Sequence, residues 1–133
     1  RVREFIVRTL DEARATGVVK TMFGRRRLVP ELNSRNGQIR SAAERVTVNM
    51  PIQGTAADIL KRAMIDLHED LPKRGLKTRM ILTVHDELLF ESPREEADAA
   101  AAAVRERMEG AAALAVPLTV DVGMADNWRD AKS

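Results

Sequence analysis

Hydrophobic positions in the first quarter of the chain predict a helix followed by a short hairpin. Residues 1–16 carry apolar side chains at helical spacing, namely Val2, Phe5, Ile6, Leu10 and Ala13. Gly17 follows directly and is a natural helix stop. Two short β-prone runs then flank Gly24, which favours an antiparallel hairpin over residues 18–30. Residues 31–37 are rich in Asn, Ser and Gly and are typical of a loop.

A second helical pattern runs from about Gln38 to Leu71. Its apolar positions recur every three or four residues and include Ile39, Val46, Met50, Leu60, Met64 and Leu67. Pro51 and Gly54 interrupt this pattern, because proline lacks the backbone donor of a helix interior and glycine is a poor helix former. We therefore expect a kink or a break between two helices at this point.

The last part of the chain has the pattern of a second hairpin, a helix and a strand. Apolar runs at residues 80–84 and 88–90 are separated by three polar residues, which predicts a hairpin with a polar tip. Ser92 is placed to cap an alanine-rich helix, with Pro93 in its first turn. Residues 117–123 alternate between apolar and polar side chains, as expected for a last strand.

This order of elements predicts one α+β domain. Strands joined by a hairpin pair antiparallel, and the helices are expected to pack on one face of the sheet. The length of 133 residues is sufficient for a single core. No run of about 18 apolar residues is present, so no membrane partner is expected. The absence of cysteine excludes disulfides and fits a cytosolic protein.

The net charge of +2 conceals an uneven distribution along the sequence. Residues 1–62 contain 13 Lys and Arg against 6 Asp and Glu, whereas residues 63–133 contain 9 against 14. A basic half next to an acidic half is consistent with a polyanion-binding face beside a carboxylate-bearing face. Lys20 and the run Arg25, Arg26 and Arg27 form a candidate phosphate-binding patch. Ordinary solvated surface charge is the alternative interpretation.

Asp86 and Glu87 form a carboxylate turn between two apolar runs. A solvated hairpin tip explains such residues without any function, since Asp is common in turns. The functional interpretation is a site for a hard cation such as Mg²⁺, which binds carboxylate, phosphate and water oxygens. His85 by itself fits a metal ligand, a phosphate contact or a packing residue.

Arg45, Asn49 and Gln53 recur every four residues in the second helical pattern, which places them on one face of a helix. Aligned amide and guanidinium groups are able to contact a DNA minor groove, where the acceptor pattern is nearly independent of sequence. An ordinary solvent-exposed face remains the alternative.

Three segments in order resemble the bacterial DNA polymerase I family, family A. They are Thr21 to Arg27, Ala43-Glu44-Arg45 leading through Asn49 to Asp58, and Val84-His85-Asp86-Glu87-Leu88, which is similar to the family's motif C. The similarity extends over essentially the whole chain. It implies that residues 1–133 are a single segment, the C-terminal palm and fingers-adjacent part of a polymerase domain. The implied fold is α+β, with an antiparallel palm-type sheet and helices on one face.

The resemblance also implies a reaction, its cofactor and its partners. The reaction is template-directed nucleotidyl transfer with two Mg²⁺ ions, in DNA replication and repair, on primer-template DNA with deoxynucleoside triphosphates. Asp86 matches a metal ligand, Glu87 an auxiliary carboxylate, and His85 a residue near the primer terminus. The DNA-binding residues would be Arg45, Asn49 and Gln53, with Arg25, Arg26 and Arg27 on phosphates. A cytoplasmic, nucleoid-associated location in a bacterium follows from the same resemblance.

Two further family motifs have no match in the sequence. One is the palm strand with the second metal-binding aspartate (motif A), and the other is the fingers helix with its nucleotide-binding Lys and aromatic residue (motif B); the chain contains no Tyr. We therefore expect a fragment that does not polymerise alone. The alternatives are a non-catalytic DNA-binding module and a structural fragment that self-associates through apolar surface.

Overall fold

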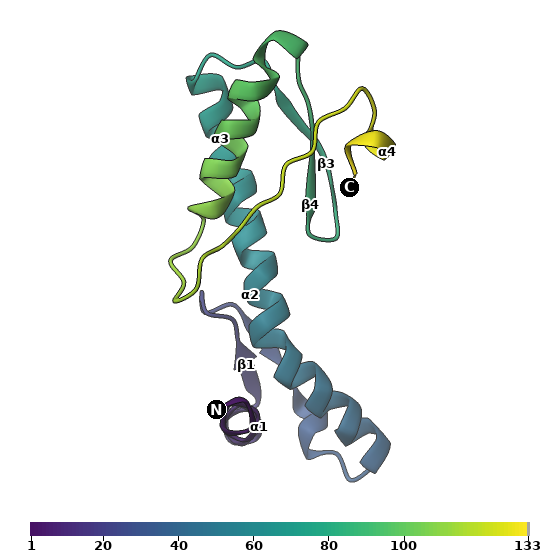
Figure 1. Cartoon of the computed structure of the whole chain (residues 1–133). Coiled ribbons are helices and arrows are strands. Elements are labelled where there is room, and N and C mark those ends of the chain that lie inside the picture. The colour runs from purple at the N-terminus through teal and green to yellow at the C-terminus, as the bar shows by residue number, and fades with distance from the viewer. Residues whose placement is uncertain (133) are drawn as a thin grey trace. The chain divides into compact units, whose positions relative to one another are not determined.

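A computed structural model describes residues 1–132 and has the predicted α+β character (Figure 1). These residues divide into two compact units, the first spanning Arg1–Asp58 and the second beginning at Ile59. The elements are α1 (Val2–Thr16), β1 (Val18–Lys20), β2 (Arg26–Leu28), the 3₁₀ helix η1 (Pro30–Asn33), α2 (Gly37–Lys73), β3 (Arg79–Val84), β4 (Glu87–Glu91), the 3₁₀ helix η2 (Arg94–Glu96), α3 (Ala97–Glu109) and α4 (Trp128–Ala131).

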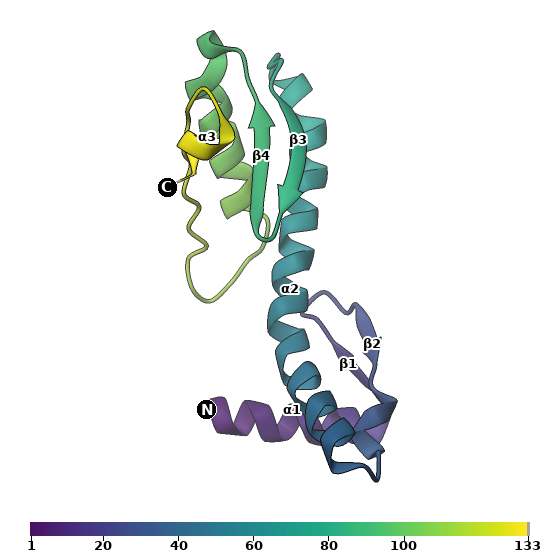
Figure 2. The ribbon, with the colours of Figure 1, turned by 90° about the vertical axis from the view of Figure 1, so that its right-hand side faces the viewer.

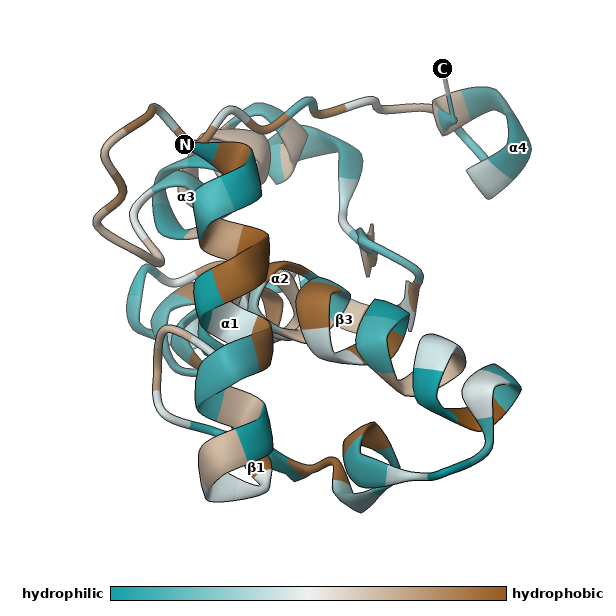
Figure 3. Ribbon diagram, turned by 90° about the horizontal axis from the view of Figure 1, so that it is seen from below, coloured by the Kyte–Doolittle hydropathy of each residue, from teal (hydrophilic) through white to brown (hydrophobic). Residues whose placement is uncertain are grey.

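The first unit contains the predicted helix and hairpin. Gly17 ends α1 with φ of 79°, a left-handed conformation that glycine adopts at little cost, and its N–H donates to the Ala13 carbonyl. β1 and β2 pair antiparallel, which confirms the hairpin around Gly24. Figure 3 shows hydrophobic and hydrophilic residues alternating along α1, as expected for a helix with one apolar side. The buried core of the unit consists of Ala13, Val19, Val29, Leu32, Ala43 and Met50.

Of the kink or break expected at Pro51, the break is wrong, because α2 runs without interruption from Gly37 to Lys73. Proline removes one backbone donor, and a helix that is held by packing on both sides of that position tolerates the loss. Thr47 and Met50, just before the proline, are buried in the first unit. Leu67, further along, is fully buried in the second. Tertiary burial thus outweighs the local cost of Pro51.

Gly54 has a packing role rather than a helix-breaking one. A Cβ at this position would lie 2.8 Å from Cγ2 of Thr21 and 3.4 Å from Nη2 of Arg25. The hairpin tip therefore approaches α2 more closely than any side chain at position 54 would allow. The glycine that suggested a break is the point where the hairpin contacts the helix.

In the second unit the β3–β4 hairpin lies across α3 and the adjoining part of α2 (Figures 1 and 2). The two strands are antiparallel, with an irregularity in register between Met80 and Leu82. One face of the hairpin contributes to a core with both helices, which confirms the prediction of helices on one face. The core consists of Leu67, Leu71, Ala103 and Val104, with Leu76, Met80, Leu88, Phe90 and Met108 packed against it.

Two predictions for the last third of the chain are wrong. Residues 117–123 belong to no strand, since no other strand among residues 1–132 pairs with them. Ser92 does not cap the helix either: its hydroxyl accepts a hydrogen bond from Thr78 and donates to the Pro93 carbonyl. Glu96 instead joins the start of the helical segment to the sheet, because its carboxylate accepts the backbone N–H groups of Lys77 and Thr78.

An ion-pair network joins α2 to α3 in the second unit. Arg107 and Arg74 both donate to the Asp70 carboxylate, at 2.8 Å and 2.5 Å, and Arg74 also reaches Glu106 at 2.7 Å. The hydrogen bond from Arg107 is the largest influence on the pKa of Asp70; burial opposes it, Arg74 reinforces it, and the result lies below the ordinary value. For Glu96 burial is the largest influence and raises the pKa, but hydrogen bonds from Lys77 and Thr78 together bring it below the ordinary value.

Replacement of Gly54 by Ala should destabilise the chain although Ala is the better helix former. The new methyl group would overlap Thr21, at a net cost of about 1–2 kcal/mol in the free energy of unfolding measured with urea. Thr21→Ser removes only the obstructing Cγ2 and keeps the hydroxyl, so Gly54→Ala with Thr21→Ser should recover most of the loss. A single Gly54→Ala variant as stable as the parent would contradict this close approach.

Acid should weaken the Asp70 network. Because the folded pKa of Asp70 lies below its unfolded value of about 3.9, its stabilisation is present above that pH and is lost as the pH falls through the folded pKa. We expect the urea midpoint to fall over this acidic range and to fall less in Asp70→Asn. Asp98→Asn, at an exposed position on α3, is the control. Equal acid sensitivity of the two variants would contradict the assignment.

Candidate carboxylate turn and nucleic-acid interface

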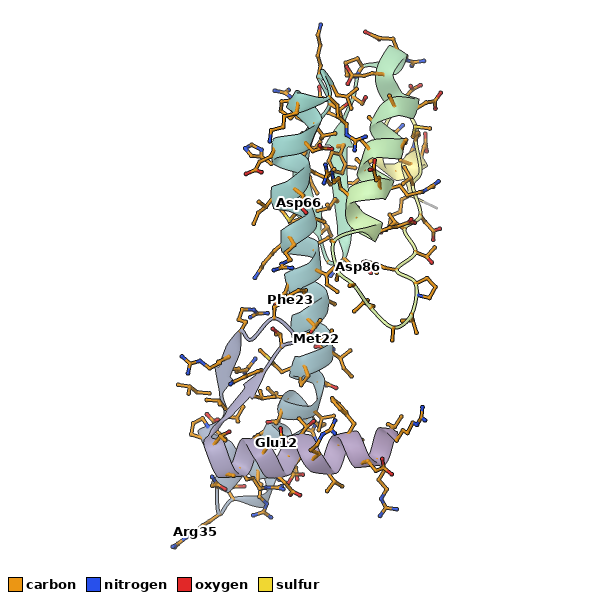
Figure 4. All side chains as sticks on the ribbon, turned by 90° about the vertical axis from the view of Figure 1, so that its left-hand side faces the viewer. Glu12, Met22, Phe23, Arg35, Asp66 and Asp86 are labelled. Atoms are coloured by element: carbon orange, nitrogen blue, oxygen red, sulfur yellow. The ribbon has the colours of Figure 1, made fainter. Side chains whose placement is uncertain are left out.

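Asp86 lies at the tip of the β3–β4 hairpin, as labelled in Figure 4. Val84 pairs with Glu87, so His85 and Asp86 form a two-residue turn. The hydroxyl of Thr83 donates to the Glu87 carbonyl at 3.1 Å and supports this turn. Asp86 is exposed, and within residues 1–132 its carboxylate has no hydrogen bond or ion pair. Its oxygens are therefore available to a ligand.

His85 adopts φ of 55°, the left-handed region that favours glycine. It is the one non-glycine residue with positive φ among the residues described. A two-residue hairpin turn commonly needs such a conformation, and Gly or Asn would supply it more readily.

Glu87 differs from Asp86 in its setting. It is the first residue of β4, where side chains alternate between the two faces of the hairpin. Leu88 and Phe90 pack on the helices, so Glu87 lies on the opposite face. The two carboxylates are neighbours in sequence, but one belongs to the turn and the other to the outer face of the strand.

The donor chemistry of this turn suits part of a Mg²⁺ site. Carboxylate oxygens are the protein ligands that Mg²⁺ uses most, usually one or two of them together with phosphates and water. Residues 1–132 contain no group of three or more His, Cys, Asp or Glu that could hold a metal ion. Asp86 therefore fits as one ligand of a shared site and not as a complete site.

The predicted polar face of α2 lies in the first unit. Arg45, Asn49 and Gln53 are all exposed, and the unbroken helix keeps the three on one side. Had α2 broken at Pro51, Gln53 would not be aligned with the other two. Beside Arg45, at the start of α2, the surface has a hollow of about 560 Å³ that is also lined by Asn36, Gly37, Gln38 and Ser41.

The basic run of the β1–β2 hairpin separates into different environments. Lys20 and Arg26 are paired across the two strands, an arrangement of like charges that is unfavourable without an anion. Arg27 pairs with Val19 and so lies on the other face of the hairpin. Arg25 has a partner within the chain, since its Nε lies 2.7 Å from Oδ1 of Asp58 on α2.

Sequence patterns did not predict this contact of Asp58. Thr55 has a related role, because its hydroxyl accepts the backbone N–H of Met22 at 2.9 Å. Both residues follow Gly54 on the helix. The sequence offered two signals for this ion pair, a carboxylate in the helix and a basic hairpin tip. That the two are paired is visible only in the tertiary structure.

An exposed carboxylate turn, a polar helical face and a basic hairpin are together typical of a protein that acts on nucleic acids. The family model described as DNA polymerase family A matches residues 1–130. The chain therefore belongs to DNA polymerase family A, as its three motifs predicted. Among the described residues no helix is both long and apolar enough to cross a membrane.

Curated relatives agree with this assignment. The chain is 53% identical over 132 residues to a thermostable DNA polymerase I of Thermus thermophilus, a match that covers 99% of this chain and 16% of the relative. It is 50% identical over 131 residues to DNA polymerase I of Bacillus subtilis, covering 98% of the chain and 15% of the relative. The chain thus spans about one sixth of the length of these relatives.

A solved structure is also similar. The polymerase domain of Pol1 from M. smegmatis, in a complex with a DNA primer-template and dNTP, matches with a TM-score of 0.94 and 46% identity. The match covers 98% of this chain and 23% of that chain.

Proposed function

We propose that the chain is the C-terminal, palm-side segment of a DNA-directed DNA polymerase and contributes Asp86 to its metal-dependent centre. The observation that carries this is the exposed carboxylate of Asp86, without a partner among residues 1–132, at a hairpin tip in a family A chain. The similar M. smegmatis domain was solved with primer-template DNA and dNTP, which supports the same partners for this chain.

Asp86 would hold Mg²⁺ as one of several oxygen ligands, and Glu87 would assist from the adjacent strand. Bound metal ions stabilise charge on the attacking oxygen and the leaving pyrophosphate in this class of reaction. The contribution of the chain is to hold the carboxylate of Asp86 in a fixed position, because the Thr83 bond and the Val84–Glu87 pair restrain the turn. His85 beside it would contact the primer terminus.

Arg45, Asn49 and Gln53 would contact the template and primer along the minor groove. Their amide and guanidinium donors match acceptors that all base pairs present there, so a duplex would be held without preference for sequence. Lys20 and Arg26 would add salt-sensitive attraction to phosphates, and the facing pair of cations gains a counter-charge when DNA binds. Arg27, on the other face of the hairpin, would reach a different phosphate.

The isolated chain would bind duplex DNA but not extend a primer. A metal site needs ligands that residues 1–132 do not supply, and no match to the family's motif A or motif B is present in the sequence. We infer that the remaining ligands and the nucleotide-binding helix come from other parts of a polymerase domain.

Self-association of the isolated chain is a second proposal. Ile81 and Leu82 of β3 are neighbouring apolar side chains that are 49% and 38% exposed, and they offer apolar surface to a second copy. Sedimentation over a range of concentrations should show a rising average mass that falls in Leu82→Asp. A monomer at every concentration would contradict this proposal without affecting the polymerase assignment.

The polymerase assignment is testable in a chimera in which this chain replaces the matching segment of Bacillus subtilis DNA polymerase I. Asp86→Ala should reduce primer extension about a thousandfold or more, because loss of a metal ligand removes several kcal/mol of transition-state stabilisation. Duplex affinity should change little.

Asp66→Ala is the matched control, since Asp66 is an exposed aspartate on α2 of the same unit (Figure 4). It should extend primers like the parent chimera. Parental activity in Asp86→Ala would contradict the metal-ligand role, and metal-dependent incorporation by the isolated chain would contradict its predicted inactivity.

A further inference from the structure

We propose that Arg25 is a positioning residue: its ion pair with Asp58 fixes the tip of the β1–β2 hairpin on α2 and so covers the side of α2 that lies opposite the proposed duplex-binding residues. The purpose of this contact rests on the duplex-binding function proposed above. The basic run at residues 25–27 then has divided roles, with Arg25 acting inside the protein and its neighbours acting on DNA.

Arg25 acts as a tether, by which we mean that its side chain joins the hairpin tip to α2 through hydrogen bonds within the protein. Its Nε donates to Oδ1 of Asp58 at 2.7 Å, and its Nη2 donates to the Gly54 carbonyl at 3.2 Å. The Asp58 side chain is only 11% exposed, so its charge depends on partners within the protein. The cation of Arg25 is thereby already balanced by a carboxylate, unlike the facing cations of Lys20 and Arg26.

Hydrogen bonds close the hairpin tip and attach it to α2. Thr21 and Arg25 close the tip, since the N–H of Thr21 donates to the Arg25 carbonyl at 2.9 Å and the Thr21 hydroxyl accepts the N–H of Arg25 at 3.2 Å. Next to them, the N–H of Met22 donates to the Thr55 hydroxyl on α2. Figure 4 shows Met22 and Phe23 at this tip, beside α2. The tip is thus fastened to the helix by both a backbone and a side-chain contact.

The fastened face of α2 is opposite the proposed duplex-binding face. At roughly 100° per residue, Asp58 lies on the other side of the helix from Asn49. Closure of one side by the hairpin therefore leaves Asn49, with Arg45 and Gln53, on the outward side. A hairpin that detached would uncover this side of α2 and would bring the negative charge of Asp58 into contact with solvent and DNA.

Direct phosphate binding by Arg25 is the competing role, and the two roles predict opposite effects of Asp58→Asn. If Arg25 is a tether, removal of the Asp58 charge loosens the hairpin and weakens duplex binding. If Arg25 contacts phosphate, removal of a nearby negative charge frees the cation and strengthens binding.

The experiment measures duplex affinity of the full chain at several salt concentrations and, without DNA, the hydrogen exchange of the Met22 amide by NMR. The variants are Arg25→Met, Asp58→Asn, their combination, and Arg25→Lys, which keeps the charge and should retain part of the protection. Arg14→Met is the matched control, because Arg14 pairs with Glu44 at 2.7 Å and joins α1 rather than the hairpin to α2. Protection of the Gly17 amide, bonded to Ala13, reports that a variant is folded.

We expect Arg25→Met and Asp58→Asn each to accelerate Met22 exchange about tenfold, which is a change of about 1.4 kcal/mol in local opening, and the double variant to add little. Each should weaken duplex binding severalfold with an unchanged salt slope. Arg14→Met should leave Met22 exchange unaltered.

Unchanged Met22 exchange in Arg25→Met would overturn the proposed tether. So would tighter binding by Asp58→Asn, or a salt slope in Arg25→Met reduced by about 0.9, the value for one lost phosphate contact. Failure of the parent chain to bind duplex would count against the proposed function, and the exchange measurement would still decide whether Arg25 holds the hairpin.

Discussion

Each of the two units is built around one buried side of α2. Without tertiary packing this helix would not be stable, because it is rich in polar residues and Pro51 lacks the backbone N–H that a helix interior needs. In the first unit Thr47 and Met50 are buried, and in the second Leu67 and Leu71 are. Because the same helix continues through both, Arg45, Asn49 and Gln53 stay aligned, and the second unit has a rigid element on which the β3–β4 hairpin packs.

Ion pairs at α2 serve different ends in the two units. In the first, Arg14–Glu44 and Arg25–Asp58 join α1 and the hairpin to the helix. In the second, Asp70 draws Arg74 and Arg107 into a network with α3. These contacts give several charged side chains a structural role. Asp86, Lys20 and Arg26 have no such ion pair among residues 1–132 and are the better candidates for contact with metal and DNA.

Local signals in the sequence were sufficient for most elements and insufficient where tertiary contacts decide. Gly17 and the polar tip at His85 and Asp86 marked their turns correctly, because turn chemistry is local. The break that Gly54 suggested was wrong. Glycine occupies this position because Thr21, which is far away in sequence, approaches it closely. Residues 117–123 alternate like a strand, but a strand exists only with a partner, and no pairing forms within residues 1–132.

The sequence predicted which residues of the candidate site to consider, but it did not predict the contacts that these residues make within the protein. Family motifs predicted Asp86 and the polar face of α2 as functional, and the structure leaves these residues exposed, whereas the internal partner of Arg25 emerged only from the folded hairpin. The chain has no cysteine, so a thiol placed at position 86 is unique in this segment. This allows metal coordination by residue 86 to be tested by a change of ligand type.

The most direct measurement is primer extension by the chimera with Asp86→Cys in Mg²⁺ and in thiophilic Cd²⁺, with Glu87→Cys and the parent chimera assayed under the same conditions. A thiolate is a poor ligand for Mg²⁺ and a good one for softer metals. If Asp86 binds the catalytic metal, Asp86→Cys should be inactive in Mg²⁺ and regain activity in Cd²⁺ relative to the parent. Full activity of Asp86→Cys in Mg²⁺ would show that residue 86 does not bind the catalytic metal.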